Sequence, residues 1–150
     1  MSIATIQTPA GITFHTHQVA CTLLSGTTTL DEKLIVKIDN ASLIAATPSV
    51  KVSLVKASDP AGAGIYGVVT KAVTANKGGY IQLGGLATCR SAAGVVIGPV
   101  TLDSAGRVKD LGTATDAMVG IALETASGSN EDIKWVLMAD GLSIYDSTVA

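Results

Sequence analysis

Short apolar runs that alternate with polar residues restrict the fold of this chain more than any other feature. Residues 50–54 have the sequence Val-Lys-Val-Ser-Leu, and in residues 33–39 every second position, Leu34, Val36 and Ile38, is apolar. A period of two places alternate side chains on opposite faces of a β-strand. Both segments are therefore predicted to be strands with one buried face.

Similar runs rich in Val, Ile and Thr recur along the chain between glycine-rich or Asn- and Asp-containing segments, which favour turns. Their spacing indicates an all-β chain that forms a single small β-barrel or β-sandwich domain. The further predicted strands cover residues 65–74, 79–83, 95–102, 118–124, 132–138 and 142–145, and the predicted turns cover residues 76–79, 103–106, 127–130 and 139–141.

The N-terminal segment carries no charge, because no Asp, Glu, Lys or Arg occurs in residues 1–30. An uncharged segment can be buried against a partner without the cost of desolvating charges. Two interpretations stay open. Residues 1–28 form an extended arm that orders on a partner or a sister subunit, or they supply the first strand of the domain, since residues 12–19 suit an ordinary strand. Residues 29–150 are predicted to form the β domain.

The amino-acid composition limits the classes of partner that the chain can bind. The 150 residues suit one domain, and only 3% of them are aromatic, so stacking surfaces for sugars or single-stranded nucleic acid are scarce. Ten basic and twelve acidic residues give a net charge of −2, and no basic cluster could neutralise a row of phosphates. We therefore expect no nucleic-acid partner.

The sequence also bears on the compartment in which the chain folds. No run of about 18 apolar residues is present, so we expect no membrane-spanning segment. The N-terminus lacks the basic region and the continuous apolar stretch of a secretory signal. Folding in a cytoplasm predicts that Cys21 and Cys89, the only two cysteines, are reduced and partly buried thiols.

One segment matches the spelling of a dinucleotide-binding turn. Residues 62–67, Gly-Ala-Gly-Ile-Tyr-Gly, fit the G-x-G-x-x-G pattern. That turn needs a helix after it and an acidic residue about 20 positions later, whereas residues 68–73 are rich in β-branched residues and no acid follows before Asp103. A loop that leads into a strand is the favoured interpretation, and no cofactor is predicted.

The two histidines fall on one side of a predicted strand. His15, His17 and Cys21 share the same parity, as ligands of one metal ion would. A closed zinc site needs four ligands, and this spacing matches no standard pattern. We interpret His15 and His17 as interface residues and predict no metal site.

No catalytic arrangement is recognisable, and we expect no enzyme. The G-x-S-x-G motif is absent, carboxylates do not cluster, and the segments typical of small trimeric dUTP-hydrolysing enzymes are missing. Arg90, the only charged residue between Lys77 and Asp103, is instead predicted to bond a partner carboxylate. The predicted partner-binding residues are Ile3, Ile6, Ile12, Phe14, His15, His17 and Arg90.

Several segments of the C-terminal half are punctuated by glycine. They are Gly-Tyr-Ile-Gln-Leu at 79–83, the Gly-Val-Val-Ile-Gly-Pro-Val stretch at 94–100 and Val-Gly-Ile-Ala-Leu at 119–123, followed by the strand at 133–137. Over residues 79–138 this order resembles the cement (head decoration) proteins of tailed bacteriophages. This resemblance implies an all-β protein that docks on the outer face of the major capsid protein lattice as a homotrimer or homodimer and secures neighbouring capsomers.

The resemblance also implies a location and a role without catalysis. The chain would fold in the cytoplasm of a bacterial host and then become part of the virion, on the outer surface of the head. Two alternatives remain. One is a tail-tube or fibre-associated β domain of a virion, and the other is a small trimeric β-fold enzyme or ligand binder whose site is assembled from distant residues.

Overall fold

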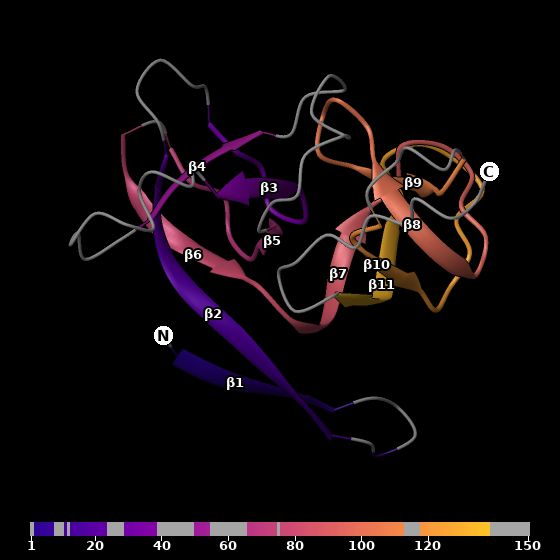
Figure 1. The fold of residues 1–150 in the computed structure, drawn as a ribbon, viewed down its shortest axis with the longest axis horizontal. Helices are drawn as coiled ribbons and strands as arrows, with labels where there is room; N and C mark the ends of the chain where they lie inside the picture. The colour runs from indigo at the N-terminus through magenta and orange to yellow at the C-terminus, as the bar shows by residue number, and fades with distance from the viewer. Residues whose placement is uncertain are drawn as a thin grey trace.

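The computed structural model describes residues 2–7, 11, 13–23, 29–38, 50–54, 66–74, 76–112 and 118–138. Within these residues the chain forms eleven strands and no helix, which confirms the predicted all-β class. The strands make two sheets rather than one closed barrel. In Figure 1 the first sheet lies on the left of the molecule and the second on the right.

The first sheet contains six strands in the order β1-β2-β4-β3-β5-β6. Strand β6 also pairs with β2. The pairings from β2 through β4, β3, β5 and β6 therefore return to β2. The β2–β4 pair is parallel, and the other strand pairs of this sheet are antiparallel. The strands are β1 (Ser2–Gln7), β2 (Thr13–Leu23), β3 (Ile35–Ile38), β4 (Val50–Leu54), β5 (Tyr66–Val69) and β6 (Gly78–Gln82).

The second sheet contains five antiparallel strands in the order β7-β11-β10-β8-β9. The register between β7 and β11 shifts between Ile133 and Val136, where the ladder is interrupted by a bulge. The strands are β7 (Gly85–Arg90), β8 (Gly98–Leu102), β9 (Val108–Asp110), β10 (Gly120–Ala122) and β11 (Asp132–Met138).

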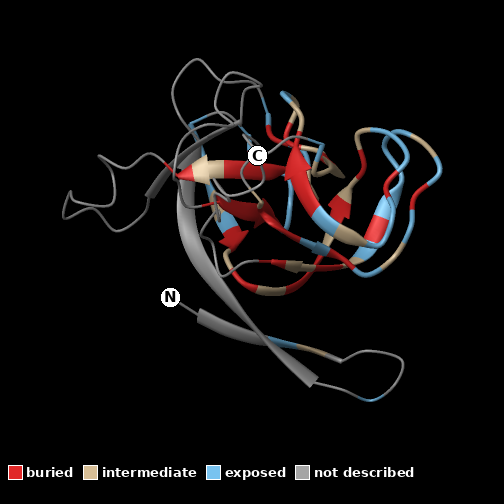
Figure 2. Ribbon diagram, turned by 45° about the vertical axis from the view of Figure 1, so that its right-hand side comes forward, coloured by how far each residue is buried: buried red, intermediate tan, exposed pale blue. Residues whose placement is uncertain are grey.

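One hydrophobic core joins the two sheets. Ile35 of β3 and Val68 of β5 lie opposite each other in register, and Tyr66 shares their face of the first sheet. All three are buried in the same cluster as Val100, Ile133 and other core residues of the second sheet. Figure 2 shows buried segments in the strands of both sheets. The two sheets therefore pack as one unit.

Strand β3 is buried on both faces. Ile35 faces the shared core, whereas Val36 and Ile38 have the opposite parity and are also buried. The prediction that residues 33–39 form a strand is confirmed over Ile35–Ile38, but the expected polar face does not apply to Ile35. The reason is that a second sheet packs on that face, as in strands covered on both sides.

A short turn brings the two sheets into backbone contact. Asp103 Oδ1 accepts hydrogen bonds from the backbone N–H groups of Ala105 (2.9 Å) and Arg107 (2.9 Å), and this arrangement holds Gly106 at a φ of 77°. The carbonyl oxygen of Gly106 then accepts a 2.7 Å hydrogen bond from the backbone N–H of Ile35. This turn was predicted at residues 103–106.

The polypeptide passes from the first sheet to the second through a turn that is fixed by a buried glutamine. Gln82 is 5% exposed, and its Nε2 donates hydrogen bonds to the carbonyl oxygens of Gly84 (2.9 Å) and Leu86 (2.7 Å). A buried amide that makes both bonds avoids the cost of an unpaired polar group. The orientation of β7 relative to β6 is therefore fixed.

The other strand predictions have mixed outcomes. Strands β4 and β11 coincide with the predicted residues 50–54 and 132–138, and the later part of the G-x-G-x-x-G segment begins strand β5, as the structural interpretation required. Strands β7 and β9 were not predicted. The segments 139–141 and 142–145 lie outside the described residues.

We predict that Gly106→Ala destabilises the fold. The added Cβ would lie 2.5 Å from the Ile35 carbonyl oxygen, and the positive φ disfavours alanine, so the free energy of unfolding should fall by about 2 kcal/mol or more. Gly112→Ala is the matched control, because nothing lies within 4 Å of its Cβ, and it should stay within about 0.5 kcal/mol of wild type. Urea denaturation measures both variants, and equal stabilities would contradict the prediction.

Candidate functional site

The N-terminal residues form a hairpin that extends beyond the first sheet. Strand β1 pairs with β2 over six positions, from Ser2 opposite Gln18 to Gln7 opposite Thr13. Strand β6 joins β2 only from Gln18 onward. We call β1 together with residues 13–17 the N-terminal hairpin, and Figure 1 shows it below both sheets. Strand β2 thus belongs to both the hairpin and the sheet.

The hairpin contains most of the predicted partner-binding residues. Phe14 lies opposite Ile6 in the strand register, His15 opposite Thr5, and His17 opposite Ile3. Ile12 lies outside the described residues, as do the side chains of Ile3, Phe14, His15 and His17. Their roles toward a partner stay predictions.

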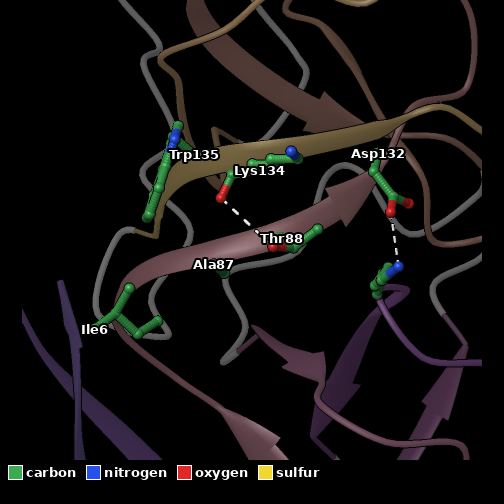
Figure 3. A pocket seen from close by; sticks show the side chains of 7 residues that line it. Ile6, Ala87, Thr88, Asp132, Lys134 and Trp135 are labelled. Atoms are coloured by element: carbon green, nitrogen blue, oxygen red, sulfur yellow. Dashed lines mark hydrogen bonds and ion pairs between the residues drawn. The ribbon is translucent and has the colours of Figure 1, made fainter. Parts of the chain in front are cut away.

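A groove of about 300 Å³ lies between the hairpin and the second sheet. Ile6 lines it from the hairpin, Ala87 and Thr88 from β7, and Trp135 from β11 (Figure 3). Lys134 and the Lys33–Asp132 ion pair complete the lining. Trp135, the only tryptophan of the chain, is half-buried here, so it offers an apolar surface to the groove.

Lys33 and Asp132 form the charged end of the groove, and they bind each other. Lys33 Nζ lies 2.7 Å from Asp132 Oδ2, and this hydrogen bond raises the pKa of Lys33 above its usual value. Lys33 itself has a φ of 68°, in the left-handed region. Because both side chains are substantially exposed, water screens the attraction and the pair adds little to stability. It closes one end of the groove without creating a reactive group.

Arg90 is engaged with a residue of its own chain. Its Nη1 lies 3.4 Å from Asp31 Oδ2, and its backbone N–H donates a 3.0 Å hydrogen bond to the Lys33 carbonyl oxygen. The side chain is 29% exposed. It therefore links the end of β7 to the segment before β3, and its predicted bond to a partner carboxylate stays a prediction.

Sequence reasoning missed an apolar row on the outer face of the second sheet. Ile121 of β10 lies opposite Pro99 of β8 on one side and Leu137 of β11 on the other. Ile121 is 37% exposed, Pro99 is exposed and Leu137 is half-buried. We call Pro99, Ile121 and Leu137 the outer row. Val96, Ile97 and Leu123 are further exposed apolar residues at the ends of the neighbouring segments.

The alternation of large and small residues explains this row. Along β10, Gly120 and Ala122 face inward and are buried, whereas Ile121 and the following Leu123 are exposed. A Cβ on Gly120 would lie 2.6 Å from the Leu137 carbonyl oxygen, so only glycine fits there. The small residues were the signal in the sequence, because close backbone packing forces them inward and leaves the large ones outside.

The start of β11 is positioned by a network around Ser91. The fully buried Ser91 Oγ donates to the Gly128 carbonyl oxygen (2.6 Å) and accepts from the Glu131 backbone N–H (3.1 Å). The Glu131 carboxylate accepts bonds from the Ser127 backbone N–H (2.9 Å) and hydroxyl (3.0 Å). Asp132, at the charged end of the groove, follows directly.

Among the described side chains, no group of three or more His, Cys, Asp and Glu residues lies close enough to hold a metal ion. Cys89 is a free thiol, and its burial raises its pKa to about 12, so it stays protonated and unreactive at neutral pH. The side chain of Cys21 lies outside the described residues.

No helix among the described residues has the length and apolar character needed to cross a membrane.

Comparison with solved structures finds a similarity of fold. No protein-family model matches the chain. No curated protein matches it. Among solved structures, the chain is similar to the crystal structure of the head fiber gp8.5 N base of bacteriophage phi29, with a TM-score of 0.57. The likeness is one of fold. At 12% sequence identity it covers 85% of this chain and 98% of that chain.

We predict that Ile6→Ala exposes Trp135. Both side chains line the groove, so removing the Ile6 side chain should let water and quencher reach the indole more easily. Acrylamide quenching of the tryptophan fluorescence should increase and the emission should shift to longer wavelength. Thr5→Ala is the matched control, because Thr5 is exposed and does not line the groove. Equal quenching of the two variants would show that the hairpin does not shield Trp135.

We predict that Glu131→Gln lowers stability at neutral pH but not in acid. The bonds from Ser127 lower the pKa of Glu131, so its ionised form stabilises the fold above its unfolded pKa of about 4.3. That contribution is lost as the pH falls through the lower, folded pKa. The melting temperatures of variant and wild type should therefore differ at pH 7 and converge in strong acid. A difference that does not depend on pH would contradict this assignment.

Proposed function

We propose that this chain is a structural protein of a phage virion that binds the outer surface of the head. In this role it contacts the major capsid protein and stabilises the lattice by bridging capsomers. The observation that carries the proposal is the fold, which matches a phage head fiber base over 85% of the chain. The resemblance of residues 79–138 to cement proteins supports the same setting. The proposal includes no catalytic step and no cofactor.

The outer row is the surface that we propose to contact the capsid. Pro99, Ile121 and Leu137 lie side by side on three paired strands, so they form an apolar row across the sheet. Apolar surface of this kind is enriched in the buried centre of protein interfaces. Ile97 and Val96, which are 63% and 62% exposed, extend the apolar character toward the start of β8.

Many modest contacts are sufficient for such a role. A capsid presents the same site many times, and an oligomer that engages several sites at once binds far more tightly than one subunit does. We therefore propose that the chain acts as a homo-oligomer, a trimer or a dimer, which folds in the bacterial cytoplasm and then decorates the head. Self-association would allow one particle to span adjacent capsomers.

A fibre-associated β domain is the second candidate, and the head fiber likeness specifically favours it. In that case the chain would anchor a projecting partner at the head rather than link capsomers. The two candidates predict different contacts. A cement protein should touch two adjacent capsomers, whereas an anchor should touch the head and a projecting partner.

We predict that the purified protein co-sediments with expanded, undecorated phage heads and saturates at a fixed number of copies per head. Ile121→Asp places a charge in the outer row and should weaken binding about tenfold or more. Tyr80→Asp is the matched control, because Tyr80 is exposed on the first sheet, and it should bind as wild type does.

Three outcomes would count against the proposal. Absence of wild-type binding would reject the head as the partner. Equal weakening by the two variants would reject the outer row as the contact surface. Self-assembly into tubes without heads would favour a tail component instead.

A further inference from the structure

We propose that the free edge of β1 pairs with β1 of a second copy of this chain, antiparallel and about a two-fold axis. This inference rests on the self-association in the proposed function and deepens it by naming the contact. Within the described residues, β1 pairs only with β2 and stands at the end of the strand order. In Figure 1 it lies at the lower edge of the molecule, beside β2.

The edge of β1 lacks the features that protect exposed strands. Proteins commonly block such edges with charged residues, prolines, bulges or very short strands. Ser2–Gln7 contains no charged residue and no proline, runs for six residues, and pairs with β2 without a register shift. An edge of this kind is a template for strand addition, in which backbone hydrogen bonds supply the affinity.

A second copy suits this edge better than an unrelated strand does, because of the charge pattern. In a two-fold strand pair, the residue at the axis lies opposite itself. Any charged residue at or near that position would therefore repel its own copy, since like charges directly opposite each other destabilise a sheet. The stretch from residue 1 to residue 30 contains no charge at all. The whole hairpin is thus compatible with meeting itself.

One register is the most favourable. With Thr5 at the axis, Thr5 lies opposite Thr5 and Ala4 lies opposite Ile6 of the second copy. Threonine pairs across antiparallel strands are favourable, and both residue types suit a sheet. Thr5 is exposed in the single chain, so it is open to such a contact. The paired hairpins would join the first sheets of two subunits into one.

The test uses the full chain in the absence of heads. Wild type, Thr5→Lys, Thr5→Glu and Thr5→Ser are compared by analytical ultracentrifugation at about 100 µM, above the micromolar Kd expected of a short strand pair. The buffer is held at pH 8 for all four proteins, and Thr5 lies opposite His15 within the hairpin. Circular dichroism shows whether each variant is folded.

We expect wild type and Thr5→Ser to be dimers, and Thr5→Lys and Thr5→Glu to be monomers of unchanged secondary structure. An equimolar mixture of the lysine and glutamate variants should recover a dimer, and native mass spectrometry should show that it contains one copy of each. A monomeric or trimeric wild type would overturn the proposal. So would a lysine variant that still dimerises, or a mixture that stays monomeric.

This result is separate from head binding. A wild-type dimer that fails to sediment with heads would retain the β1 pairing and reject the proposed function. A monomeric wild type that sediments with heads would reject the β1 pairing and retain the proposed binding to the head.

Discussion

The structure depends on strand β3, which is buried on both faces. Ile35 packs into the core of the second sheet, Val36 and Ile38 pack on the opposite face, and the Ile35 N–H bonds the turn at Gly106. Because Ile35 lies in the core that the two sheets share, the sheets cannot separate without exposing it. Burial of each aliphatic side chain stabilises the fold by roughly 1.5–3 kcal/mol, so the junction is a strong constraint.

This junction determines where the interaction surfaces lie. The first part of β2 belongs to the hairpin, and from Gln18 onward β2 pairs with β6 in the first sheet. This pairing of β2 with β6 fixes the direction of the hairpin. The groove that contains Trp135 exists because the hairpin then lies over β7 and β11. The outer row, in contrast, faces away from the shared core. The molecule therefore presents an apolar row on the second sheet and an open strand edge on the hairpin.

The sequence predicted local structure better than it predicted the partners of each strand. Alternation located β4 and β11, and the turn residues Asn76, Gly106 and Asn130 have the positive φ values that their residue types allow. Strand β7 was missed because Gly-Leu-Ala-Thr-Cys-Arg has few β-branched residues and is held in place by pairing with β11. Such pairing between distant segments is a tertiary effect that no local pattern encodes.

The candidate surfaces were predicted only in part. Absence of charge is visible in the sequence, and it marked residues 1–28 as an arm or a first strand; strands β1 and β2 of the hairpin lie in this segment. The outer row was missed because Ile121 and Leu123 look like core residues until the inward positions of Gly120 and Ala122 are known. The ion pair of Arg90 with Asp31 joins residues 59 positions apart and could not be inferred from spacing.

Electron cryomicroscopy of phage heads saturated with the protein tests the account most directly. We expect density for both sheets on the outer surface of the head, with the outer row of Pro99, Ile121 and Leu137 against the shell and the N-terminal hairpin reaching toward a neighbouring copy. Density in which the second sheet faces solvent, or a head surface that carries no copy of the chain, would contradict the account.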